Sequence, residues 1–162
     1  MLFRSKYSNL VLKFKKNNNV EIIFEPGRSI CGNTGVLVSK IIYLKDAPNK
    51  KFIIIDAAMN DLMRPALYGA KHEIYPLLKN NSMIKKNTEF VGPVCESSDT
   101  FISYNKYQNL NEGDFICINN IGAYGRSLAS NYNTRPYSAE VLINKNTYKI
   151  IKQRQKLEFL IN

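Results

Sequence analysis

From Gly35 onward the sequence is a series of short segments rich in β-branched and aromatic residues, each ended by turn-forming residues. Runs of this kind, separated by Pro, Asn, Asp or Gly, are typical of β-strands joined by short loops. Eight such segments at close spacing predict an antiparallel barrel or sandwich. They are residues 35–44, 51–57, 72–78, 88–94, 99–104, 113–119, 139–144 and 147–151.

The part before Gly35 has a different character. Residues 5–16 carry apolar side chains among lysines, which indicates an amphipathic helix, and residues 20–24 (VEIIF) predict a buried strand. We therefore expect two regions: residues 1–34 as the last helix–strand unit of a truncated barrel, and residues 35–162 as a β domain. The predicted fold class is mainly β (α+β), with short helices at residues 61–68 and 124–130 and another near residues 152–160.

Composition limits the function classes. The chain has 162 residues and a net charge of +10, but its lysines are scattered among Asn and Ile, which favours a solvated surface over nucleic-acid binding. No apolar run approaches the roughly 18–20 residues that span a membrane. No secretion signal is evident, so we expect a cytoplasmic protein. Three cysteines without metal-type spacing argue against disulfides and against a metal site.

The first segment with functional character is EPGR, residues 25–28. Glu25 can pair with a protonated ring nitrogen, Gly27 lets a phosphate approach the backbone, and Arg28 suits phosphate or carboxylate. Without other evidence, the same residues would also form an ordinary turn with a surface ion pair.

The second segment is residues 56–73. Arg64 and Tyr68 are four residues apart, so in a helix they share one face and can hold a carboxylate. A surface arginine beside a half-buried tyrosine is the alternative. His72 is the only histidine, and without a companion ligand or base it is expected to be structural.

Two further segments follow. In residues 91–99, Cys95 comes after a Gly-Pro turn, where a thiol can donate a proton, and Glu96 can bind an ammonium group. In residues 119–142, Tyr124 lies between two glycines, so its ring can reach a phosphate or a flat cofactor. A capped loop and a locally packed hairpin are the respective alternatives.

The four motifs occur in the order EPGR, DAxMNDLxRPALYxAxHE, VGPVCESxD and GAYGxSxxSNYNxRPxxAEVL. In this order they closely resemble diaminopimelate decarboxylases, a pyridoxal-phosphate-dependent family of the alanine-racemase-like (fold type III) group. The resemblance runs from about Tyr7 to the carboxyl terminus. The chain departs from the usual motifs at Ala58, Gly69, Lys71 and Ser98, and none of these departures removes a functional side chain.

The resemblance implies a cofactor and a role for each motif. Glu25 would face the pyridinium nitrogen of pyridoxal 5'-phosphate, Gly27 and Tyr124 would contact the cofactor, and Arg28 would bind its phosphate or the substrate.

The resemblance also implies a diamino-acid substrate. Arg64 and Tyr68 would hold its distal carboxylate, Glu96 its distal ammonium, and Tyr124 would contact it; Cys95 would be catalytic, supplying the proton that replaces carbon dioxide. Cys95 and Glu96 would act across a dimer interface.

The family's Schiff-base lysine, with its glycine-rich phosphate loop, has no counterpart in these motifs. We therefore expect the chain to be a carboxyl-terminal part of a carbon–carbon lyase that makes lysine from meso-2,6-diaminopimelate, and to be inactive alone. Its partner would be a second copy or a separately encoded barrel half. A gene-decay remnant, a split enzyme and a truncated gene model stay open, as does a non-catalytic domain that dimerises or binds proteins.

Overall fold

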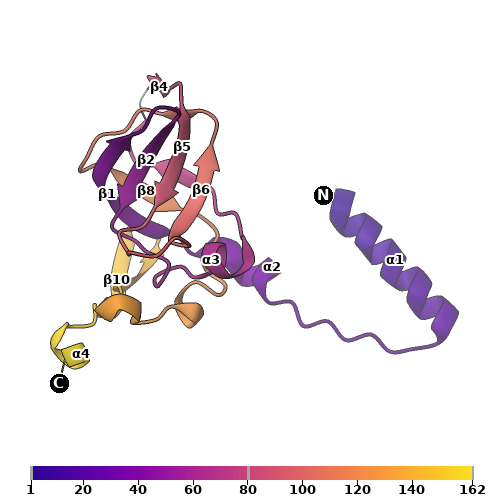
Figure 1. Cartoon of the computed structure of the whole chain (residues 1–162). Coiled ribbons are helices and arrows are strands. Elements are labelled where there is room, and N and C mark those ends of the chain that lie inside the picture. The colour runs from indigo at the N-terminus through magenta and orange to yellow at the C-terminus, as the bar shows by residue number, and fades with distance from the viewer. Residues whose placement is uncertain (1, 80, 162) are drawn as a thin grey trace.

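The computed structural model describes residues 2–79 and 81–161, with side chains from residue 5 onward. Its main feature is a six-stranded sheet in the order β3-β8-β1-β2-β5-β6 (Figure 1). The strands are β1 (Leu37–Asp46), β2 (Lys50–Ile55), β3 (Ile74–Pro76), β5 (Asn87–Val91), β6 (Thr100–Tyr104) and β8 (Phe115–Ile118). We call this sheet with its connecting loops the sheet body.

Alternating apolar residues bury one face of these strands and form the core. In β1 the side chains of Ser39 and Ile41 are buried, whereas Val38 is 52% exposed. Fully buried residues of the core include Ile41, Ile53, Ile55, Phe90, Ile116 and Ile118. The ring of Phe90 packs edge-on against Tyr107, with centroids 5.0 Å apart.

Short elements complete the molecule. Strands β4 (Met83–Ile84) and β7 (Tyr107–Gln108) pair with each other, and β9 (Glu140–Asn144) forms a hairpin with β10 (Thr147–Lys152). The helices are α1 (Leu2–Asn18), α2 (Arg28–Cys31), α3 (Arg64–Tyr68) and α4 (Glu158–Ile161), with 3-10 turns η1 (Gly32–Thr34), η2 (Arg126–Leu128) and η3 (Tyr132–Thr134).

The amino-terminal segment, residues 2–27, stands apart from the sheet body (Figure 1). It consists of α1 and an extended stretch that ends at α2. The apolar side chains of Leu10, Leu12 and Phe14 are more than half exposed. The ring of Tyr7 makes an edge contact with Phe24, 6.3 Å between centroids, so the helix packs against its own connection.

The predicted mainly β architecture is confirmed, with two differences. The pairing of β2 with β5 is parallel, so the sheet is mixed and not wholly antiparallel as predicted. The strand predicted at residues 20–24 does not form: the stretch is extended and unpaired, and Ile23 is 81% exposed. A strand needs a neighbouring strand for its backbone hydrogen bonds, and the described residues provide none there. The helices expected at residues 61–68 and 152–160 are confirmed as α3 and α4, shorter than predicted, and η2 replaces a helix at residues 124–130.

Candidate functional site

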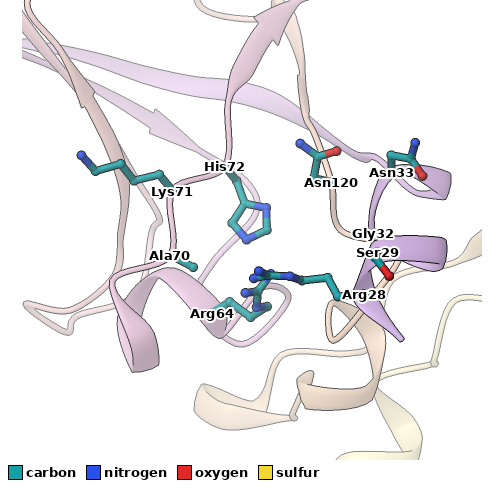
Figure 2. A pocket seen from close by; sticks show the side chains of 9 residues that line it. All are labelled: Arg28, Ser29, Gly32, Asn33, Arg64, Ala70, Lys71, His72 and Asn120. Carbon is teal, nitrogen blue, oxygen red and sulfur yellow. The ribbon is translucent and has the colours of Figure 1, made fainter. Parts of the chain in front are cut away.

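A cavity of about 460 Å³ lies between α2, α3 and the loop after β8 (Figure 2). Arg28 enters it from α2 and Arg64 from α3, and both guanidinium groups are seen below the ring of His72 (Figure 2). Lys71 also lines the cavity, but its side chain points away from the two arginines. No carboxylate is among the described residues that line it. The cavity therefore suits an anion, and guanidinium groups match a carboxylate or phosphate in shape as well as charge.

Local geometry places both arginines. Arg28 begins α2, whose first turn is closed by the amides of Ile30 and Cys31 donating to the carbonyl of Gly27, at 3.0 and 3.1 Å. Arg64 begins α3, which has Pro65 in its first turn and ends at Gly69 in the left-handed conformation, φ 61°. Arg64 is 9% exposed, while Arg28 is exposed. The structure thus brings together the arginines of the first two motifs.

His72 is buried at the edge of this cavity. Its Nδ1 lies 2.9 Å from the carbonyl oxygen of Asn119, and because a carbonyl only accepts, Nδ1 carries the proton. Burial lowers the pKa of His72 below its ordinary 6.5; the Asn119 carbonyl raises it in part, and the charges of Arg64 and Arg28 lower it again. The ring is therefore neutral near pH 7, and Nε2 is a buried acceptor without a hydrogen-bond partner.

Tyr68 is not brought into the cavity. It ends α3, is 66% exposed and is not among the lining residues. A five-residue helix spans little more than one turn, so four-residue spacing alone does not direct both side chains to one ligand.

Cys95 and Glu96 are exposed on the loop between β5 and β6, and neither lines the arginine cavity. The buried Asp99 holds this loop: its carboxylate accepts the amides of Met59 at 2.7 Å and Val94 at 2.9 Å. Burial raises the pKa of Asp99 above its ordinary 3.8, although these two hydrogen bonds lower it in part. A Cβ at Gly92 would overlap the Asp99 carboxylate, which explains the glycine there.

A polar network fastens the loop before α3. The side chain of Asn60 is fully buried and donates to the carbonyl of Ser130 at 3.2 Å. Arg135 donates to Asn60 Oδ1 at 3.0 Å and forms an ion pair with Asp61 at 3.6 Å. These contacts join the second motif to the fourth and so fix the position from which Arg64 extends.

Tyr124 lies on the loop after β8, which is docked on η1. The amides of Ile121 and Gly122 donate to the carbonyls of Gly35 and Gly32, both at 3.0 Å. A Cβ at Gly122 would overlap the carbonyl oxygen of Cys31, so only glycine permits this approach. Tyr124 itself has φ 60°, an uncommon conformation for a residue with a side chain, and is 53% exposed.

The residues predicted to bind the cofactor adjoin one another. The hydroxyl of Tyr124 lies 3.8 Å from the position that a Cβ on Gly27 would take, and Arg28 follows Gly27 directly. Glu25 is exposed two residues earlier, so its carboxylate is open to a ligand. A hydroxyl, a backbone without a side chain and a guanidinium are suitable donors for a phosphate, and the carboxylate suits a protonated ring nitrogen. The donor set therefore fits pyridoxal phosphate.

Other kinds of site find little support in the described part of the chain. It contains no group of three or more His, Cys, Asp or Glu residues arranged to hold a metal ion. None of its helices has the length and apolar character needed to cross a bilayer.

Comparison with known proteins identifies the family of the chain. Residues 9–122 match the model of the family described as "Pyridoxal-dependent decarboxylase, C-terminal sheet domain". The chain therefore belongs to the pyridoxal-dependent decarboxylases and carries their carboxyl-terminal sheet domain, which confirms the predicted family and cofactor class.

Its relatives are diaminopimelate decarboxylases. The Vibrio cholerae enzyme is 45% identical over 157 residues, covering 96% of this chain and 37% of that protein. The Aquifex aeolicus enzyme is 38% identical, covering 95% of this chain and 36% of that one. The crystal structure of Helicobacter pylori diaminopimelate decarboxylase complexed with L-lysine superposes with a TM-score of 0.83 at 41% identity, over 96% of this chain and 38% of that chain. The chain thus spans little more than a third of the length of these relatives.

Proposed function

We propose that this chain supplies the carboxyl-terminal share of the active site of a diaminopimelate decarboxylase, a cytoplasmic carboxy-lyase that converts meso-2,6-diaminopimelate to L-lysine. The observation that carries the proposal is the meeting of Arg28 and Arg64 in one cavity without a carboxylate among its described lining residues. Their pairing supports recognition of a carboxylate at the far end of the substrate, and Tyr68 would close over that end.

Four residues would hold the cofactor. Glu25 would accept a hydrogen bond from its ring nitrogen, and Gly27, Arg28 and Tyr124 would bind its phosphate side. When bound, pyridoxal phosphate supplies an electron sink for the bond that loses carbon dioxide.

The remaining assigned residues act on the substrate. Glu96 would bind the distal ammonium, so that both charged groups at the far end are matched. As the carbon–carbon bond breaks and carbon dioxide leaves, the proton on Cys95 Sγ would form the new carbon–hydrogen bond. Cys95 is exposed, so its thiolate could then regain a proton from water.

The partner follows from the position of these residues. Cys95 and Glu96 lie outside the arginine cavity, which supports a site completed by another chain: a second copy, or a separately encoded barrel half carrying the Schiff-base lysine. In such an assembly the β5–β6 loop of one chain would reach the cavity of its neighbour.

Reconstitution tests the proposal. The purified chain would be mixed with the barrel portion of the Vibrio cholerae relative, pyridoxal phosphate and meso-2,6-diaminopimelate, and carbon dioxide release measured. We expect release from the mixture and none from the chain alone. An Arg64→Ala chain should still assemble but lose activity by about a hundredfold or more, since a charged partner of the substrate is removed. Assembly with bound cofactor but no carbon dioxide release would contradict the proposal.

A non-catalytic dimerisation domain is the second candidate, and the β9–β10 hairpin favours it. Apolar side chains there are exposed, among them Ile143 at 72% and Tyr148 at 77%, which suits a protein contact. Light scattering of the chain with and without the barrel portion separates the two functions. Self-association with no binding of the barrel would support the second.

A further inference from the structure

We infer that His72 is a positioning residue of the arginine cavity: when a carboxylate binds there, the free Nε2 takes a hydrogen bond from the guanidinium of Arg28 or Arg64 and so directs that guanidinium at the carboxylate. The inference rests on the proposed function in one respect, that the cavity takes a carboxylate. It goes beyond that function by giving a role to a residue that touches neither substrate nor cofactor.

The ring of His72 is held from one side only. It is 2% exposed, and its Nδ1–H donates to the carbonyl of Asn119 at 2.9 Å. This bond fixes both the tautomer and the orientation of the ring, which directs Nε2 into the cavity (Figure 2).

The other nitrogen is the unusual feature. Nε2 of His72 is buried and has no hydrogen-bond partner. Native structures satisfy nearly all buried polar atoms, so an unpaired one at a cavity wall points to a hydrogen bond that forms when a ligand binds.

The cavity offers donors that match this acceptor. Arg28 and Arg64 carry five N–H donors each and no acceptor, and both lie near enough to lower the pKa of His72. A carboxylate can occupy two N–H groups of a guanidinium on one side. A neutral imidazole can take another N–H, which keeps the fork in the plane that the carboxylate needs.

The charge state of the ring matters as much as its position. Among the described residues that line the cavity, Arg28, Arg64 and Lys71 are the ones with charged side chains. A protonated His72 would add a further positive charge to the cavity. Its Nε2 would then carry a proton and could no longer accept a hydrogen bond from the arginines, which only donate. The neutral ring can accept a hydrogen bond from a guanidinium, and it leaves the positive charge of both arginines available to the anion.

Two substitutions separate the role of Nδ1, which holds the ring in place, from the role of Nε2, which accepts a hydrogen bond. In His72→Asn the side-chain amide can still donate to the Asn119 carbonyl, but nothing replaces Nε2. In His72→Gln the longer side chain can present its oxygen where Nε2 lies. The probe is pimelate, a seven-carbon dicarboxylate, and cadaverine, a diamine without carboxylates, is the control ligand.

We expect His72→Asn to bind pimelate about tenfold more weakly than the unmodified chain, the loss typical of one hydrogen bond to a charged group. His72→Gln should recover most of the affinity. Thermal unfolding of each variant shows whether it is folded. Equal affinity of folded His72→Asn and unmodified chain would overturn the inference, as would failure of His72→Gln to recover any affinity.

A spectroscopic measurement on the unmodified chain does not depend on any variant folding. Since the chain has a single histidine, long-range ¹H–¹⁵N NMR correlations of its ring are unambiguous. We expect protonated Nδ1 and bare Nε2 near pH 7, and an Nε2 resonance that moves with pimelate and not with cadaverine. A charged ring, an Nε2–H tautomer or an Nε2 resonance unmoved by bound pimelate would overturn the inference. Complete absence of pimelate binding would instead count against the carboxylate cavity of the proposed function, and the tautomer in the free chain would then decide the histidine's role.

Discussion

The sheet body and the amino-terminal segment contain the same kinds of apolar residue, but the sheet body buries them and the amino-terminal segment leaves them exposed. Ile41, Ile53 and Phe90 are fully buried between strands, whereas Leu10 is 66% and Ile23 81% exposed. The two regions differ in the elements that pack against their apolar residues and not in their local sequence pattern. A strand of the sheet body has pairing partners and a covered face, while α1 contacts its own connection through Tyr7 and Phe24.

Only some of the site residues follow the same boundary, because Tyr68, Cys95, Glu96 and Tyr124 are exposed although they belong to the sheet body. Arg64, His72 and Asp99 belong to the sheet body and are buried. Glu25 and Gly27 belong to the amino-terminal segment and are exposed. The sheet body thus holds Arg64 and His72 in place, whereas Glu25 and Gly27 are open to solvent.

The largest expected effect is in the core. Phe90→Ala should lower the free energy of unfolding by about 3–5 kcal/mol, because the ring is fully buried and packs against Tyr104 and Tyr107. The matched change Phe14→Ala, on α1, should cost no more than about 0.5 kcal/mol. Urea unfolding measures both. Similar losses for the two would mean that α1 is buried in solution and would break the comparison.

A smaller loss is expected where α2 meets the loop of Tyr124. Gly122→Ala should destabilise by about 1–3 kcal/mol, since the new methyl group overlaps backbone that is fixed by hydrogen bonds. Gly27→Ala is the control, because its Cβ would be in ordinary contact with Tyr124, and it should change stability by less than about 1 kcal/mol. Equal effects of the two would show that the loop is not docked on η1.

The free energy of unfolding should depend on pH through His72. Its pKa is lowered in the folded chain, so the unfolded chain binds more protons and the free energy of unfolding falls as pH drops below 6.5 toward the folded pKa. The raised pKa of Asp99 acts in the opposite direction and only above 3.8, so a comparison with His72→Asn isolates the histidine. Urea unfolding between about pH 7 and 5 should show a steeper decline for the unmodified chain than for His72→Asn. Parallel curves would mean that the imidazole is not desolvated.

The smallest effect should come from removing α1. Deletion of residues 1–19 should leave the free energy of unfolding within about 0.5 kcal/mol of the full chain, because the described side chains of this helix lie outside the core. It should also reduce self-association, as exposed Leu10 and Phe14 are lost. A loss of several kcal/mol would show that the helix packs on the sheet body.

Much of the fold could be predicted because strands and turns have local signatures. Residues 35–44 and 113–119 are rich in β-branched and aromatic residues and are bounded by turn residues, and they form β1 and β8. Choice of partner is not local, so the parallel pairing of β2 with β5 was not predictable from the pattern. The prediction of a strand at residues 20–24 was wrong for the same reason. The composition of these residues is strand-like, but a strand forms only where another strand pairs with it.

The site was predictable to the extent that its residues carry recognisable motifs. Arg28 and Arg64 come from two of them and share a cavity, as a common substrate role requires. Asn60 and Arg135 were part of motifs but had no assigned role, because their importance lies in hydrogen bonds across 75 residues of sequence. The buried Nε2 of His72 could not be anticipated, since burial is a property of the fold.

The most direct test of the account is substrate discrimination by the reconstituted enzyme. Diaminopimelate and lysine differ at the far end by one carboxylate, the group that Arg28 and Arg64 are proposed to bind. The account predicts that kcat/KM favours diaminopimelate by about 10⁴-fold, and that Arg28→Ala and Arg64→Ala each remove most of this preference. Arg64→Ala should slow diaminopimelate turnover and not lysine turnover, whereas Arg28→Ala should slow both, diaminopimelate more, because Arg28 is also proposed to bind the cofactor. If both variants discriminate as well as the unmodified chain, the arginine cavity does not read the carboxylate and the central claim is wrong.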